Sequence, residues 1–258
     1  MISPDDIAKQ LIVAERERTP IAAFTDANPD LDVDTAYLAQ QAFVQAKLDA
    51  GERVVGAKLG LTSRAKQEAM GVDSPLSGVV TSGMLAPFGA PIDLSGLIHP
   101  RVEPEIAFVL ARDVEAPATV SSVLAATETV CAAIDVIDSR YEEFRFRLPD
   151  VIADNASAAR FLVGPQSVSP DQIGDLRLLG CVVRANGDVA ATAAGAAAMG
   201  HPAAAVAWLA NSLAQRGAML KAGWTVFSGG LTAPIALSGK SFVTVEFDGL
   251  GTIEAFTG

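Results

Sequence analysis

The chain has 258 residues and a formal net charge of −11, and half of its residues are hydrophobic while only 19% are charged. Such a composition supplies enough apolar side chains for a large core and excludes intrinsic disorder. The acidic balance leaves no basic patch to neutralise phosphates, which excludes a nucleic-acid-binding protein.

The first fifty residues are predicted to form a helical N-terminal arm. Ser3-Pro4-Asp5-Asp6 begins a helix, with a capping serine, a proline in the first turn and acidic residues near the positive end. Asp34 is the expected cap of a second helix over residues 35–50, which Gly51 ends. No strong linker follows, so we expect a single domain over 1–258, with the arm at 1–50 and the catalytic core at 51–258.

Residues 51–258 are predicted to contain more strands than helices. Helices are expected at 64–70, after a cap at Thr62 or Ser63, and at 119–130 and 202–217. Residues 73–78 are expected to be a loop, and residues 148–161 irregular with at most one helical turn. Strands are expected at 53–61, 97–110, 131–138, 223–230 and 241–256, with a hairpin over 176–192 that turns at Asn186-Gly187. Because strands and helices do not alternate strictly, this order predicts an α+β fold.

The motifs of several common enzyme classes do not occur in the chain. It has no glycine-rich nucleotide-binding fingerprint, no phosphate-binding loop and no nucleophile elbow, and both of its histidines precede proline. Cys131 and Cys181 lie in apolar stretches, which predicts buried free thiols in a reducing compartment. No apolar run approaches the roughly 18 residues of a membrane-spanning helix, and the N-terminus lacks signal-peptide features. We therefore expect a cytoplasmic protein without a membrane partner.

Two glutamates begin an otherwise apolar strand. Glu103 and Glu105 are two positions apart, so their side chains point to the same face of that strand. Asp135 lies in a second apolar strand, whereas Asp138, three residues on, faces the other way. Three buried carboxylates repel one another unless a hard divalent cation such as Mg²⁺, Mn²⁺ or Ca²⁺ binds them. The alternative is a solvated Glu-x-Glu edge and a salt-bridged Asp135.

Other polar residues in apolar segments are candidates for ligand binding. Lys58 either orients a substrate carboxylate or moves a proton, or else it extends its amine to the surface. Arg140 either forms a fork for a substrate carboxylate or an ordinary ion pair. His99 is a candidate proton shuttle or a structural histidine. The segment 228–234, with Ser228, Gly229 and Thr232, offers backbone N–H groups and hydroxyls in a turn, as a carboxylate nest or a plain connection.

Five segments in one order carry a resemblance to a known family. They are VVGAKLGLTSRAKQEAMGVDSP, IHPRVEPEIAFVL, IDSRYEEFRFRLPDVIADNASAARFLVG, GHPAAAVAWLANSLAQRG and AGWTVFSGGLTAP. Together they resemble the 4-oxalocrotonate decarboxylase and 2-hydroxypentadienoate hydratase family, within the fumarylacetoacetate hydrolase superfamily. The resemblance covers the chain from about Leu31 to its end.

The resemblance implies a mixed β-sheet or β-roll core that binds Mg²⁺ or Mn²⁺ through three carboxylates. Glu103 and Glu105 match the family's Glu-x-Glu pair, and Asp135 stands where the family usually has a third glutamate. Lys58 matches the lysine of the Lys-x-Gly-x-Thr-Ser motif near the substrate's carboxylate end, and Leu61 would offer its backbone N–H.

The same resemblance favours a decarboxylase over a hydratase. Asp138-Ser139-Arg140-Tyr141 and Gly230-Leu231-Thr232-Ala233 look like the decarboxylase versions of these segments. The implied reaction turns 4-oxalocrotonate, a small dicarboxylic 2-oxo acid, into 2-hydroxypenta-2,4-dienoate and CO₂ in meta-cleavage degradation of aromatic compounds. The alternatives are the hydratase, a C–C hydrolase, or a non-catalytic partner of a hydratase. The resemblance also implies a homo-oligomer and a possible hydratase partner.

Overall fold

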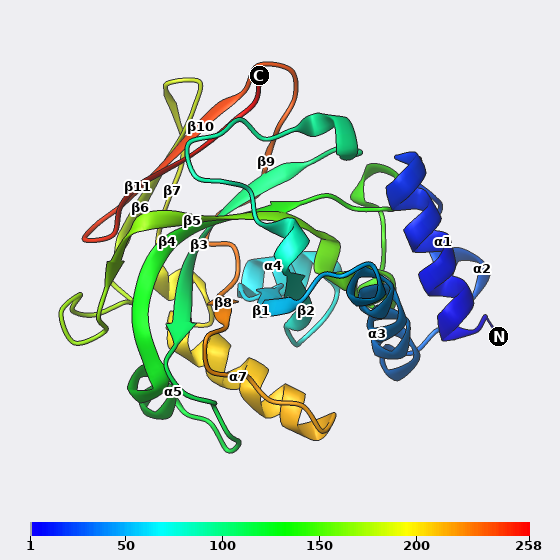
Figure 1. The fold of residues 1–258 in the computed structure, drawn as a ribbon, viewed down its shortest axis with the longest axis horizontal. Helices are drawn as coiled ribbons and strands as arrows, with labels where there is room; N and C mark the ends of the chain where they lie inside the picture. The colour runs from blue at the N-terminus through cyan, green and yellow to red at the C-terminus, as the bar shows by residue number, and fades with distance from the viewer. Residues whose placement is uncertain (1) are drawn as a thin grey trace.

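The computed structural model describes residues 2–258, which form two β-sheets with helices packed around them (Figure 1). The strands are β1 Val54–Gly60, β2 Leu76–Thr81, β3 Arg101–Leu110, β4 Thr127–Ile137, β5 Ala158–Val168, β6 Gly180–Ala185, β7 Asp188–Ala194, β8 Thr225–Phe227, β9 Ile235–Ala236, β10 Phe242–Phe247 and β11 Gly251–Phe256. The helices are α1 Pro4–Glu17, α2 Phe24–Ala27, α3 Val33–Asp49, α4 Arg64–Met70, α5 Val120–Ala126, α6 Leu148–Ala153 and α7 Pro202–Gln215. Short 3₁₀ turns occupy Ser82–Met84, Leu94–Gly96, Glu142–Phe144, Asn155–Ser157 and Gly195–Ala197.

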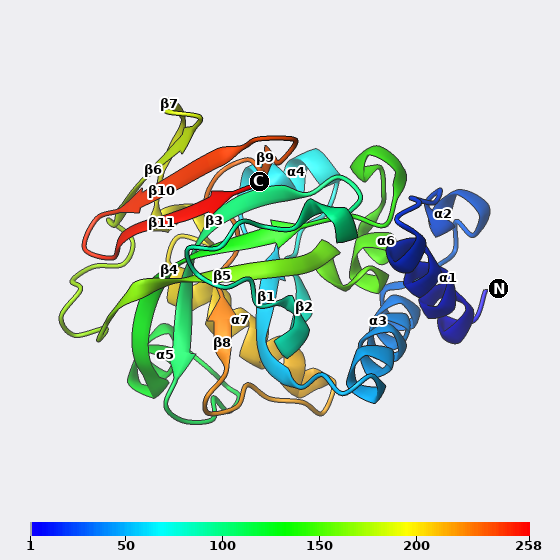
Figure 2. The same cartoon turned by 45° about the horizontal axis from the view of Figure 1, so that its top comes forward.

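The larger sheet has seven strands in the order β2-β1-β8-β3-β4-β5, and β9 also pairs with β3. The smaller sheet has the order β11-β10-β6-β7 and lies at the opposite end of the molecule from α1 and α3 (Figure 2). Among the described strands only β1 and β8 pair in parallel. This mostly antiparallel arrangement confirms the predicted α+β fold.

Several predicted element boundaries are confirmed and others are wrong. The Ser3 hydroxyl caps α1 by accepting a hydrogen bond from the Asp6 N–H, and Asn186 and Gly187 form the expected hairpin turn with φ of 52° and 97°. The cap of α3 is Asp32, whose carboxylate accepts from the Thr35 N–H at 2.7 Å, so the assignment to Asp34 was wrong.

Two strands occupy segments that were not predicted as strands. β2 includes Leu76–Gly78 from the expected loop, and β5 begins at Ala158 within the segment expected to be irregular. β4 also starts at Thr127, four residues before the predicted strand at Cys131. Each of these segments is extended because it pairs with a distant strand, β2 with β1 and β5 with β4, and such tertiary pairing overrides local propensity.

One face of β3 and β4 contributes to the main apolar core. Ile106 and Phe108 on β3 and Ile134 and Val136 on β4 have no solvent exposure. They pack in one cluster with apolar residues of α7 and of the smaller sheet. Because successive side chains alternate, the opposite face of the same strands carries Glu103, Glu105 and Asp135.

The N-terminal helices form a second apolar cluster. Ile7 and Leu11 of α1, Phe43 of α3 and Ile152 of α6 are buried together, and Tyr141 is buried with them. This cluster packs the N-terminal helices against α6, which directly precedes the Asn155–Ser157 turn. Within residues 2–258, no helix combines the length and apolar character needed to cross a membrane.

Candidate active site

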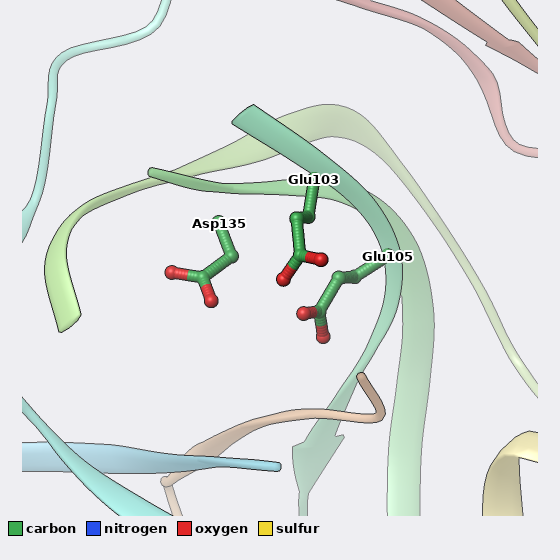
Figure 3. Close-up of side chains that lie close together, drawn as sticks. All are labelled: Glu103, Glu105 and Asp135. Atoms are coloured by element: carbon green, nitrogen blue, oxygen red, sulfur yellow. The ribbon is translucent and has the colours of Figure 1, made fainter. Parts of the chain in front are cut away.

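The strand register brings three acidic side chains together. Glu103 on β3 lies directly opposite Asp135 on β4, and Glu105 lies two positions along the same face, opposite Ala133. Figure 3 shows the three carboxylates pointing toward one region, and each places an oxygen within 4.8 Å of the others. Like charges directly opposite on a sheet are destabilising, so this arrangement requires a compensating positive charge.

Burial makes the repulsion within this carboxylate cluster stronger. Glu105 is fully buried, and Asp135 and Glu103 are only 3% and 8% exposed. Burial raises the pKa of Glu105 well above its ordinary value, and the charges of Asp135 and Glu103 raise it further. Burial also raises the pKa of Asp135, although the Lys58 ammonium acts in the opposite direction.

Lys58 supplies one positive charge from β1. In a flat sheet β1 and β4 would lie about 14 Å apart, because two strands separate them. The sheet curves so strongly that Lys58 Nζ lies 2.5 Å from Asp135 Oδ2. Lys58 is 2% exposed, and its ammonium donates a hydrogen bond to the Ala156 carbonyl at 2.8 Å. Its amine therefore does not extend to the surface, which was the alternative considered from the sequence.

The turn after β8 closes the base of the cluster. The Gly229 N–H donates to Glu105 Oε2 at 2.6 Å, with Gly229 at φ 100°, where side chains are disfavoured. A Cβ at Gly230 would lie 2.6 Å from the Glu103 carboxyl carbon, so any other residue there would displace the Glu103 side chain. Ser228 is fully buried beside the turn, whereas the Thr232 hydroxyl donates to the Ala233 carbonyl at 3.0 Å.

Several buried oxygen atoms in and beside the carboxylate cluster have no hydrogen-bond partner. Among the described residues they are Glu105 Oε1, Asp135 Oδ2, Ser228 Oγ and Thr62 Oγ1. Asp135 Oδ2 is close to the Lys58 ammonium, but the contact lacks the angles of a hydrogen bond, so we treat it as an ion pair. Unsatisfied buried acceptors are rare in proteins and need a partner. Carboxylate oxygens in this arrangement suit a hard divalent cation, so the residues present fit the metal that the sequence predicted.

A cavity of about 420 Å³ opens onto the carboxylate cluster. Three cations line it, Lys58, Lys66 and Arg101, together with Phe144 and Phe146. Leu61 lines it too and has an unusual φ of 56° for a leucine. The cavity is therefore charged at the cluster and apolar elsewhere, which is typical of a site for a small organic anion.

The structure corrects the role expected for Arg140. This residue is 1% exposed and does not line the cavity. Its guanidinium forms an ion pair with Asp154 and donates to the Asp138 carbonyl at 2.8 Å and the Ala158 carbonyl at 3.2 Å. Since these contacts occupy most of its N–H groups, Arg140 has a structural role and no fork is left for a substrate carboxylate.

Two other acidic and basic candidates also lie outside the cluster. Asp138, directly after the end of β4, accepts hydrogen bonds from the Ile98 and His99 N–H groups at 2.8 and 2.7 Å and is not part of the carboxylate cluster. The His99 Nε2 lies 2.8 Å from the Ser139 carbonyl, and its ring packs 4.7 Å from Phe144.

Sequence reasoning missed Lys66 and Arg101. Lys66 on α4 lies 2.6 Å from Glu103 Oε1 and donates to the Gly230 carbonyl at 3.2 Å. The sequence predicted the helix at 64–70 that contains Lys66 but no role for its side chain. Arg101 precedes Glu103 by two residues, so the strand alternation that paired Glu103 with Glu105 already placed it on the same face.

Comparison with known proteins places the chain in a family. Residues 56–256 match the family model for the fumarylacetoacetate (FAA) hydrolase C-terminal region. The chain belongs to the fumarylacetoacetate hydrolase family. Membership of this family, together with the structural match to a 4-oxalocrotonate decarboxylase, confirms the resemblance inferred from the five sequence segments.

Within this family the chain is similar to both decarboxylases and hydratases. It is 42% identical over 250 residues to a 4-oxalocrotonate decarboxylase of Pseudomonas sp. (strain CF600), covering 96% of this chain and 94% of that protein. It is 41% identical over 215 residues to a 2-hydroxypent-2,4-dienoate hydratase of Pseudomonas putida, covering 83% and 96%. The 4-oxalocrotonate decarboxylase from Pseudomonas putida G7, complexed with magnesium and adipate, matches with a TM-score of 0.94 and 39% identity, covering 98% and 96%.

Proposed function

We propose that the protein is a metal-dependent decarboxylase that converts 4-oxalocrotonate into 2-hydroxypenta-2,4-dienoate and CO₂. The observation that carries this proposal is the buried carboxylate cluster with Lys58, in a chain that superimposes over nearly its whole length on a 4-oxalocrotonate decarboxylase holding magnesium and a dicarboxylate. Glu103, Glu105 and Asp135 would hold Mg²⁺ or Mn²⁺ in this proposal.

The reaction breaks the bond between C5 and the C6 carboxylate of the substrate. The electron pair of that bond moves through the conjugated double bond toward the 2-oxo group, where negative charge develops. A divalent cation bound by the three carboxylates supplies positive charge that stabilises this developing charge. The protein's own groups must orient the 1-carboxylate end and provide a proton for the 2-oxygen.

Lys58 is positioned for both tasks. Its ammonium has three N–H groups, of which one donates to Ala156 and another faces Asp135, leaving a donor for a ligand in the cavity. The buried contacts fix the amine, so it needs little reorganisation during the reaction. Leu61 lines the cavity, and Gly229 donates its N–H to Glu105 in the turn that also contains buried Ser228. These three residues are proposed to complete the binding of the substrate.

The first test is direct measurement of CO₂ release. Purified protein with Mg²⁺ is expected to release CO₂ from 4-oxalocrotonate, and EDTA is expected to stop the release until Mg²⁺ is restored. Turnover that continues at full rate in EDTA would refute the metal-dependent mechanism.

Replacement of Lys58 tests its catalytic role. Lys58→Met is expected to lower kcat by about 10²–10⁴-fold, the usual range for loss of a proton-transfer group. Mg²⁺ affinity, measured by calorimetry, should change by less than about tenfold because all three carboxylates remain. An increase in KM with unchanged kcat would instead assign Lys58 to substrate binding alone.

A second candidate function is hydration of 2-hydroxypenta-2,4-dienoate. The hydratase relatives support it, because their identity to this chain is nearly as high as that of the decarboxylases. Assaying the same protein with both substrates separates the two. Consumption of 2-hydroxypentadienoate without CO₂ release from 4-oxalocrotonate would replace the decarboxylase proposal.

We also propose a cytoplasmic, homo-oligomeric enzyme that associates with a hydratase, which would consume its product. The two free buried cysteines are compatible with a reducing compartment. Sedimentation of the protein alone and with a hydratase tests the two associations, and a monomer in both runs would refute them.

A further inference from the structure

The three cations that line the cavity differ in their partners. Lys58 faces Asp135 and Lys66 faces Glu103, so both already neutralise the carboxylate cluster. Arg101 has no ion-pair partner among the residues that the structure describes. It is therefore the one cation of this wall that is free to bind an anion.

An aromatic ring holds the Arg101 guanidinium in place. Its central carbon lies 3.9 Å from the centroid of Phe144, a cation–π contact that leaves the N–H edge of the fork available. Glu143 and Phe144 have φ of 54° and 57°, a left-handed conformation that each non-glycine residue adopts only at a cost in free energy. The loop keeps this conformation and so places Phe144 at the cavity beside Arg101.

The spacing along β3 matches the length of a six-carbon dicarboxylate. Arg101 and Glu103 are two residues apart on one face, which corresponds to about 7 Å along a strand. The carboxyl carbons of an extended six-carbon diacid are about 6 Å apart, from five carbon–carbon bonds. A substrate with its 2-oxo end at the carboxylate cluster therefore brings its other carboxylate to Arg101.

We propose that Arg101, stacked on Phe144, binds the distal carboxylate of a dicarboxylic 2-oxo acid and selects it over the monocarboxylic analogue. This inference rests on the proposed function, because it assigns the leaving end of that same substrate.

Arg101 acts on binding and not on bond breaking. The departing carboxylate becomes neutral CO₂, so a cation that holds it stabilises the substrate more than the transition state. Arg101 is only half-buried, and solvent weakens its hold on the carboxylate. Loss of Arg101 is therefore expected to raise KM for 4-oxalocrotonate about tenfold while kcat stays equal or increases.

The test uses two unreactive ligands that differ in one carboxylate, 2-oxoadipate and 2-oxohexanoate, titrated calorimetrically into Mg²⁺-loaded protein. The wild type is expected to bind the diacid about tenfold more tightly. Arg101→Met should remove this preference without changing affinity for the monoacid. Arg101→Lys, which keeps the charge but not the planar fork, should retain part of it. Arg184→Met, which removes an exposed arginine on β6, serves as the matched control.

The outcomes separate this inference from the proposed function. Equal affinity of the wild type for both ligands, or a diacid preference that survives Arg101→Met, overturns the assignment of Arg101 while leaving the decarboxylase proposal intact. A wild type that binds neither 2-oxo acid overturns the proposed function and this inference with it. A diacid preference lost only in the Arg101 variants supports the assignment, whether or not CO₂ is released.

Discussion

Glu105→Gln is expected to abolish Mg²⁺ binding and activity while raising the thermal stability of the metal-free protein. Glutamine has nearly the same shape, and its carbonyl oxygen still accepts the Gly229 N–H. The substitution removes a fully buried carboxyl group of the cluster, whose charged form is disfavoured by burial and by the charges of Asp135 and Glu103. In the metal-free protein the Glu105 charge destabilises the fold, so its removal should raise the stability. In the metal-bound protein Glu105 is expected to be a ligand, so its removal should abolish metal binding and the stability that the metal adds.

Thermal denaturation with and without Mg²⁺ measures both effects of Glu105→Gln. A cation that binds only the folded wild type at 100 times its Kd stabilises it by about 2.7 kcal/mol, and this increment should vanish in the variant. Glu128→Gln, which changes an exposed glutamate of β4, is the matched control and should keep the full increment. If Mg²⁺ raises the Tm of Glu105→Gln as much as that of wild type, Glu105 is not a ligand.

Strand alternation predicted part of the carboxylate cluster. It placed Glu103 and Glu105 on one face and favoured Asp135 over Asp138, and the structure brings Glu103, Glu105 and Asp135 together without Asp138. The register that sets Asp135 opposite Glu103 comes from the pairing of β3 with β4, which alternation alone does not give. Alternation could not predict that Lys58 meets Asp135, because that contact depends on the curvature of a sheet whose strand order is tertiary information. Lys66 is a similar case, since nothing in its helical segment indicates a partner on β3.

The loops around the site were the least predictable part. Asn155, Ala156 and Ser157 all have φ between 51° and 55°, although none is glycine and only Asn155 is of a residue type that often adopts the left-handed conformation. Asn155 bonds to the backbone of Val79 on β2, a strand that was itself not predicted. Such a loop forms only because several distant contacts determine it together.

Arg140 supplies one of these distant contacts. It pairs with Asp154, whose carboxylate also accepts a hydrogen bond from the Ser157 hydroxyl at 3.0 Å. Ala156 lies between Asp154 and Ser157 in this loop, and its carbonyl accepts the hydrogen bond from the Lys58 ammonium. Arg140 also lies over the Phe43 ring, at 5.4 Å, and so joins the loop to α3. Arg140, one of the sequence candidates for binding a substrate carboxylate, is therefore a support for the loop that contacts Lys58.

Arg140→Met is expected to lower the free energy of unfolding by about 3–5 kcal/mol, because it leaves Asp154 buried without its ionic partner. Burial already raises the pKa of Asp154 to about 6 beside Arg140. Burial acts to lower the pKa of Arg140, but Asp154, Glu15 and Asp138 together raise it overall. The guanidinium therefore stays charged, whereas burial disfavours the charged form of the Asp154 carboxylate.

The pH dependence of this loss follows from the same pKa shift. A buried acid with a raised pKa binds a proton more tightly in the folded state than in the unfolded state, so its contribution to stability decreases as pH rises through its folded pKa. The loss in Arg140→Met should accordingly be larger at pH 8 than at pH 5, where Asp154 takes up a proton. Urea denaturation of the wild type and of Arg140→Met at pH 8 and pH 5 measures this difference in the free energy of unfolding.

A second substitution separates the structural role of Arg140 from substrate binding. In Arg140→Met with Asp154→Leu both members of the buried ion pair are removed, so stability should recover by at least 1 kcal/mol relative to the single variant, as expected when an apolar pair replaces a buried ion pair. Full stability of Arg140→Met with a raised KM for 4-oxalocrotonate would contradict this account and return Arg140 to the substrate. The position of its guanidinium, enclosed between α3 and the 154–157 loop, favours the loss of stability.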